Sequence, residues 1–200
     1  SRWSFRKLGL PIPKVLNEFY PKPDFIVVPP NYAFDRKIFF GTRYDGVYMS
    51  AGDDQKWSAI WEHQPVSDLV ISPAFSSDAT LFATVRGKGI YKTTNGGLKW
   101  RAINNGLAQE FVNLKLAENV RPTLDLTMQD IKLSVSSHYK VDEVVFAGSA
   151  GGLYKTEDGG ASWHRLEVLR SGEPAFIIAI ASSPDYEKDP TRRYPVLYLQ

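Results

Sequence analysis

The chain has 200 residues, 43% of them hydrophobic and 23% charged, so it carries enough apolar material for a packed domain of ordinary composition. Its formal net charge of +2 is too small to predict nucleic-acid binding. No apolar run reaches the roughly 18 to 20 residues of a membrane-spanning helix, so the chain is not expected to span a membrane. Because it has no cysteine, disulfides, thiolate metal sites and cysteine nucleophiles are excluded.

A repeat organises the chain from its first residues to its last. Residues 1–24, with Trp3 and several prolines, are interpreted as the end of one repeat unit followed by an extended connector. The first complete unit occupies 25–66 and the second 67–106, and within them Ile26–Trp57 aligns without a gap on Leu69–Trp100 at a shift of 43 positions. The matched pairs include Pro30 with Pro73, Asp35 with Asp78, Phe39 with Phe82, Arg43 with Arg86, Gly46 with Gly89, Tyr48 with Tyr91 and Trp57 with Trp100. After an insertion at 107–131, a third unit occupies 132–172 and a partial fourth unit occupies 173–200.

Each unit contains four short segments rich in β-branched and aromatic residues and bounded by turn residues. In the second unit these segments predict strands at 68–72, 81–85, 90–94 and 100–103, with a turn at 73–79. Four antiparallel strands every 40 to 45 residues or so are the period of a propeller blade. We therefore predict an all-β fold, a β-propeller of four-stranded antiparallel blades. Since propellers usually close with about 4 to 8 blades, we favour a segment of a larger propeller over a four-bladed ring completed by the Trp3 strand.

A turn motif recurs between the third and fourth predicted strands. The second unit has Thr93, Asn95, Gly97 and Trp100, and the third has Thr156, Asp158, Gly160 and Trp163 at the same spacing. In this pattern the Asp or Asn side chain accepts backbone N–H bonds, the Gly supplies a positive φ, and the Trp anchors the strand that follows. The first unit keeps Ser50 and Trp57 but has Gly52 and Asp54 in place of the acid and the glycine, which predicts a looser turn.

These motifs resemble the Asp-box of bacterial neuraminidase (BNR) repeats, found in sialidase-like β-propellers, xyloglucan-cleaving glycosidases, the sortilin ectodomain and the photosystem II assembly factor. The resemblance implies a fold and leaves the activity open, since these relatives differ in function. In them the Asp-box is a peripheral folding element, so the motif residues are expected to be structural. The resemblance also implies an extracytoplasmic location, meaning secreted, periplasmic or lumenal.

No catalytic constellation is predicted. Asp35, Asp78, Asp142 and Asp189 recur once per unit, which is typical of a turn residue rather than a catalytic acid. The acids that do not recur could supply the carboxylate pair of a glycosidase, with no spacing to select among them: Glu110, Asp125, Glu143 and Glu173. The three histidines have no metal-ligand spacing, and neither a metal nor a cofactor is predicted.

Departures from the repeat are where function is expected in a propeller. The largest is the 107–131 insertion, in which Phe111, Leu114 and Arg121 are candidate partner-binding residues. A second is the basic loop with Arg192 and Arg193. The leading hypothesis is a non-catalytic scaffold that binds other protein subunits of an extracytoplasmic complex, either free or associated with a membrane.

An alternative is a glycoside hydrolase with part of its site outside this segment. Trp57, Trp61 and His63 lie close together in the sequence, where ring stacking on a glycan is conceivable. Packing of Trp57 in the protein interior is the favoured interpretation.

Overall fold

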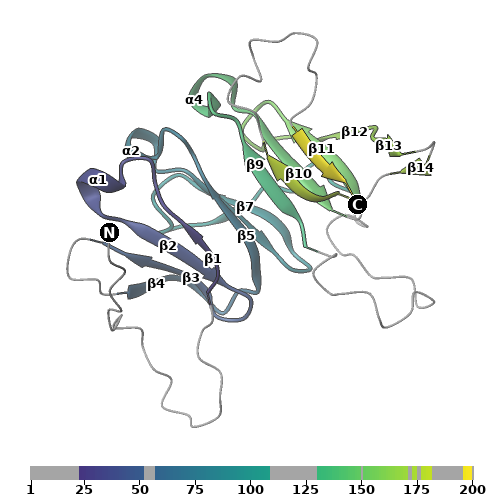
Figure 1. Ribbon diagram of the computed structural model, residues 1–200. Helices are drawn as coiled ribbons and strands as arrows, with labels where there is room; N and C mark the ends of the chain where they lie inside the picture. Colours follow the sequence, from purple (N-terminus) through teal and green to yellow (C-terminus); the bar gives the residue numbers. More distant parts are fainter. Residues whose placement is uncertain are drawn as a thin grey trace, which may run out of the picture.

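The computed structural model describes residues 23–51, 57–108, 130–149, 151–170, 173–174, 177–181 and 196–199. The fold is all-β, as predicted, with successive antiparallel sheets set side by side (Figure 1). None of the described helices has the length and hydropathy of a membrane-spanning helix.

Three sheets have four strands each, and the strands are ordered as in the sequence. Sheet 1 consists of β1 (Pro23–Val27), β2 (Ile38–Thr42), β3 (Gly46–Ser50) and β4 (Trp57–Glu62). Sheet 2 consists of β5 (Val66–Ile71), β6 (Leu81–Val85), β7 (Gly89–Thr93) and β8 (Arg101–Ala102). Sheet 3 consists of β9 (Lys132–Val135), β10 (Val145–Ser149), β11 (Gly152–Thr156) and β12 (His164–Leu166). Two hairpins follow, β13 (Leu169–Arg170) with β14 (Glu173–Pro174), and β15 (Ile177–Ala181) with β16 (Val196–Leu199).

The predicted strands of the second unit are all present, with shifted ends. The second strand has the predicted bounds, and the third is displaced by one residue. The first begins at Val66, earlier than predicted, because a bulge between Val66 and Asp68 lets pairing continue past an irregular register. The fourth is shorter than predicted and excludes Trp100, whose ring stacks on Trp61 of sheet 1 at a centroid distance of 4.5 Å.

Single helical turns replace the plain turns expected between the first and second strands. They are α1 (Tyr32–Asp35), α2 (Phe75–Asp78) and α4 (Tyr139–Asp142), and a left-handed residue ends each one. The recurring acid closes this turn. Asp78 accepts bonds from the Thr80 amide at 2.9 Å and the Ser72 hydroxyl at 2.6 Å. Asp142 accepts the equivalent pair. The structural interpretation of these acids is therefore confirmed where the structure describes them, and Asp189 lies outside the described residues.

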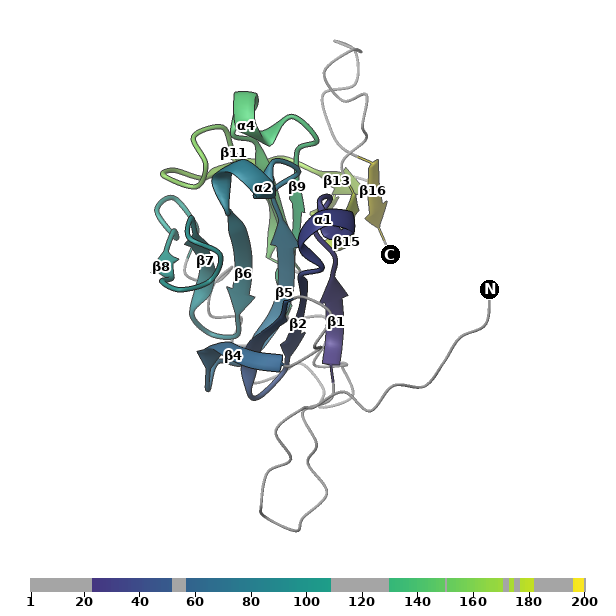
Figure 2. The same ribbon diagram turned by 90° about the vertical axis from the view of Figure 1, so that its left-hand side faces the viewer.

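Two clusters of buried apolar side chains lie between neighbouring sheets in the part of the chain that the structure describes. Alternation along β6 sends Leu81 and Ala83 toward sheet 1 and Phe82 toward sheet 3, and all three are fully buried. The first strand of each sheet contacts the first strand of the next, from β1 through β5 and β9 to β15 (Figure 2). These first strands therefore form the common inner row of the assembly.

Lys92 ties sheet 2 to sheet 3 by a polar contact within this apolar packing. Its ammonium donates to the Gly159 carbonyl at 2.9 Å and lies 5.5 and 5.6 Å from the ring centres of Phe82 and Tyr139. Burial lowers the pKa of Lys92, so the aromatic contacts and the carbonyl offset part of the cost of placing a cation there.

Candidate functional site

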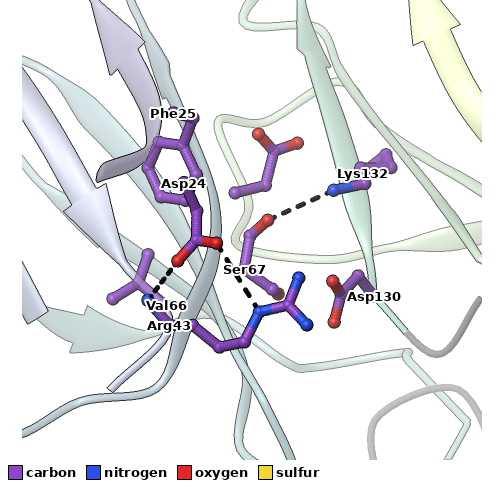
Figure 3. Close-up of a pocket in the computed structure, with 8 residues that line it drawn as sticks. Asp24, Phe25, Arg43, Val66, Ser67, Asp130 and Lys132 are labelled. Atoms are coloured by element: carbon purple, nitrogen blue, oxygen red, sulfur yellow. Dashed lines mark hydrogen bonds and ion pairs between the residues drawn. The ribbon is translucent and has the colours of Figure 1, made fainter. Parts of the chain in front are cut away.

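A pocket lies where the inner strands begin. Asp24 of β1, Asp68 of β5 and Lys132 of β9 line it, with Arg43 from the loop after β2 and Asp130 just before β9 (Figure 3). The cavity has a volume of about 170 Å³. The antiparallel topology places this pocket at one end of the sheets and the helical turns at the other.

Asp68 joins two neighbouring inner strands. Its carboxylate accepts the Leu69 amide at 3.0 Å and, across the sheet boundary, the Leu133 amide at 2.8 Å. Burial raises the pKa of Asp68, while the two amide bonds and the nearby Lys132 ammonium act in the opposite direction. Both carboxylate oxygens are thus engaged by backbone donors, which makes Asp68 a structural link between sheets 2 and 3.

Asp130 forms a closed ion pair behind the pocket. The Arg86 guanidinium donates to both of its oxygens at 2.8 Å, in the bidentate geometry that suits a carboxylate. The Asp130 side chain is only 4% exposed. Next to this pair, the Thr84 hydroxyl donates to the Ile131 carbonyl at 3.1 Å and also contacts the Ser67 hydroxyl at 2.8 Å. The wall between sheets 2 and 3 is therefore fixed by hydrogen bonds.

Arg43 and Asp24 form the more open side of the pocket. The Arg43 main-chain amide donates to Asp24 at 2.6 Å, whereas its guanidinium Nε lies 3.7 Å from the other carboxylate oxygen. The two side chains are 29% and 34% exposed, respectively. Figure 3 shows the guanidinium extending past Asp24 toward the side of the pocket where Asp130 lies. The second cation, Lys132, donates to the Ser67 carbonyl at 3.2 Å.

The three acids of the pocket differ in how fully their oxygens are engaged. A general acid and base need carboxylates that are available to a substrate. Asp68 and Asp130 accept hydrogen bonds on both oxygens, from amides and from arginine, respectively. Asp24 accepts one amide, and its other oxygen has no hydrogen bond among the described residues. Nowhere in the described ranges do three His, Asp or Glu side chains gather closely enough to hold a metal ion.

The predicted turn motifs lie at the end of the sheets opposite the pocket. The Thr156 hydroxyl accepts the Gly160 amide at 2.9 Å and donates to Asp158 at 2.6 Å, and Asp158 accepts the Ser162 amide at 2.9 Å. Hydrogen bonds from Ser162 and Thr156 hold the pKa of Asp158 well below its usual range.

The motif of the second unit has the same bonds, with an amide side chain in place of the carboxylate. Thr93 accepts the Gly97 amide at 3.1 Å, and Asn95 accepts the Lys99 amide at 3.0 Å. Gly97 and Gly160 have φ values of 97° and 93°. The two turns therefore hold the same backbone conformation with different side-chain charge.

Three tryptophans of the repeat have different surroundings. Trp163 is 2% exposed, and its indole N–H donates to the Ile103 carbonyl of the preceding sheet at 2.6 Å. Trp100 instead stacks on Trp61, and its buried N–H has no partner among the described residues. Trp57 packs edge-on against Phe40 at 4.6 Å, which agrees with a packing role. Trp61 is thus part of the packing between sheets 1 and 2.

Several predicted residues lie outside the described residues. They are Phe111, Leu114, Arg121, Arg192 and Arg193, together with Gly52 and Asp54 of the first turn. Ser50, at the start of that turn, is buried at the end of β3 and pairs in register with Trp57. The pocket acids were missed because they do not recur. Asp24 aligns with Ser67 and Ile131, whereas Asp68 aligns with Phe25 and Lys132.

Comparisons with known proteins identify the architecture. No protein-family model matches the sequence, and no curated protein matches it. Among solved structures, an ancestral GH74 enzyme is similar at 18% identity with a TM-score of 0.56, covering 82% of this chain and 21% of that one. The GH74 enzyme of Niastella koreensis is similar at 14% identity with a TM-score of 0.52, covering 80% of this chain and 26% of that one.

The chain has a β-propeller fold. Its four-stranded sheets are propeller blades, and their inner row is the row of strands nearest the propeller axis. At these identities the likeness establishes the fold alone. The chain spans about a fifth to a quarter of the length of these two enzymes.

Proposed function

We propose that this chain is a non-catalytic β-propeller module that binds other proteins, as part of an extracytoplasmic assembly. The observation that supports the proposal most directly is the state of the pocket acids. Asp68 and Asp130 are held by backbone amides and by Arg86, which leaves them to fix the blades together rather than to react. A rigid platform with unoccupied cationic groups at one end is suited to holding a partner.

The blades are proposed to be BNR repeats. The hydrogen bonds of Thr156, Asp158 and Gly160 are those that the Asp-box spacing requires, and they support this assignment. An extracytoplasmic location follows from the resemblance, since most such propellers are secreted, periplasmic or lumenal. The 107–131 insertion and the Arg192 loop remain the candidate contact segments.

A glycoside hydrolase is the second candidate, because the two similar structures described above are GH74 enzymes. For this function the carboxylate pair would come from acids such as Glu110 and Asp125, which lie outside the described residues. Glu143 is less suitable, because it ends α4, at the end of the sheets opposite the pocket. A glycoside hydrolase would have the same propeller fold and would use acids other than those that line the pocket.

Two assays separate the candidates. In the first, the chain is immobilised, captured proteins are identified, and the binding of each is measured with purified components. A variant with Phe111, Leu114 and Arg121 replaced by serine tests the insertion and spares Asp130, which the fold requires. In the second, the chain is incubated with polysaccharides, and glycan cleavage is measured. Specific binding with no cleavage supports the module. Cleavage that is abolished by a single Asp or Glu substitution would establish the enzyme instead.

A further inference from the structure

Both cations that line the pocket, Arg43 and Lys132, have unused hydrogen-bond donors. Both oxygens of Asp68 and both oxygens of Asp130 already accept bonds. In contrast, the terminal Nη groups of Arg43 have no partner among the described residues, and Lys132 uses one of its three N–H donors on Ser67. These unused donors are cationic, and their natural complement is an anionic acceptor placed on the side of the Arg43 guanidinium away from Asp24, whose Oδ1 has no hydrogen bond among the described residues.

The size of the pocket limits what can enter it. Sites for whole small molecules typically have volumes of about 300 to 1,000 Å³, whereas this cavity has about 170 Å³. It holds one functional group and a few linking atoms. The rest of a ligand would lie outside, on the end of the blades, which fits a side chain or a terminus of a larger partner.

We propose that this pocket binds a carboxylate carried by a partner protein. Both Nη groups of Arg43 donate hydrogen bonds to that carboxylate, and Lys132 supplies the second positive charge. The inference rests on the proposed binding function and adds the chemistry of the group recognised. The carboxylate has two possible sources, an acidic side chain or a chain terminus, and the experiment below separates them.

The acids around the pocket leave room for this ligand. Asp130 is neutralised by its bidentate pair with Arg86. Asp24 lies on the Nε side of the Arg43 guanidinium, so the edge formed by the two Nη groups faces away from it. Asp68 is oriented by the Leu69 and Leu133 amides. The incoming carboxylate therefore meets the two Nη groups of Arg43, while the Nε side of the same guanidinium faces the Asp24 carboxylate.

The test uses the complete chain and nuclear magnetic resonance. Sodium propionate and propionamide, which have the same shape and differ in charge, are titrated while the main-chain amide signals at the pocket, such as that of Leu133, are followed in the parent chain and in every variant. We expect saturable shifts with propionate only. The variants R43M and K132M should each bind about tenfold more weakly or worse, since each loses a charge-assisted contact. R165M, which removes an exposed arginine from β12, is the matched control and should bind as the parent does.

Folding of the variants is checked by their melting temperatures. The main-chain bond from residue 43 to Asp24 does not depend on the side chain, so R43M is expected to fold. Equal shifts with propionamide, or equal loss in R165M and R43M, would overturn the inference. Peptides then identify the source. Binding of an amidated glutamate peptide supports a side chain, whereas binding of only a free C-terminus supports a terminus.

Failure of this inference can be told apart from failure of the proposed function. If R43M captures and binds partner proteins as well as the parent chain does, the module remains and the carboxylate pocket is rejected. If propionate binds saturably and no partner is captured, the pocket remains and the assembly function is rejected.

Discussion

Replacing Trp163 by phenylalanine removes one hydrogen bond between two blades while keeping an aromatic ring in place. The Trp163 indole donates to the Ile103 carbonyl across the boundary of sheets 2 and 3, at 2.6 Å and in a buried setting. Phenylalanine leaves that carbonyl buried without its donor, which costs about 1 to 3 kcal/mol. Loss of part of the indole adds a cavity cost of about 1 kcal/mol. We expect W163F to lower the free energy of unfolding by about 2 to 4 kcal/mol.

The chain contains its own matched control. Trp100 occupies the same repeat position one blade earlier, but its buried N–H has no partner among the described residues. W100F therefore removes no bond, and it retains part of the stack on Trp61. Its expected cost is about 1 to 2 kcal/mol, from the smaller ring and the weaker stacking.

Urea unfolding, followed by circular dichroism, compares the two variants. At a slope of about 2 kcal/mol per molar urea, W163F should lower the midpoint by about 1 to 2 M and W100F by about 0.5 to 1 M. The comparison is made at equal slopes, so that a change in midpoint reports a change in stability. A loss in W100F as large as that in W163F would refute the claim that the inter-blade hydrogen bond distinguishes the two positions.

Three further predictions concern turns and charges. G97A should lower the melting temperature well beyond G96A, since a Cβ at Gly97 would collide with the preceding blade, whereas one at Gly96 meets open space. R86M should destabilise the fold by about 3 to 5 kcal/mol in urea unfolding at neutral pH, because it leaves Asp130 buried and unpaired. D158N should flatten the acid limb of the stability profile. The pKa of Asp158 is lowered on folding, so its contribution is complete above its ordinary value of 3.8 and is lost as the pH falls below it.

The repeat could be predicted from the sequence because it is local and recurs. Residues such as Phe39 and Phe82 mark the same strand in successive copies and lie in the core of the structure. The helical turns were harder to predict. A single turn such as α2 is set by one acid that bonds to nearby amides and by one left-handed residue, and neither produces a hydrophobic period. The start of the fourth strand of the second unit could not be predicted either, because Trp100 lies outside β8 and stacks on Trp61 of the preceding blade.

The pocket could not be found from the repeat, because the charged residues that line it differ from one unit to the next. At the start of the inner strand, sheet 1 has Asp24, sheet 2 has Asp68 one repeat position later, and sheet 3 has Lys132. Taken alone, each of them is an ordinary charged residue at the edge of an apolar segment and predicts no site. Only the topology, which sets the inner strands side by side, brings them to one end of the propeller. In a repeat protein, aligned positions near the axis are neighbours in space. Aligned positions that carry the same residue in every unit indicate a structural role. Aligned positions that carry opposite charges in different units indicate a site.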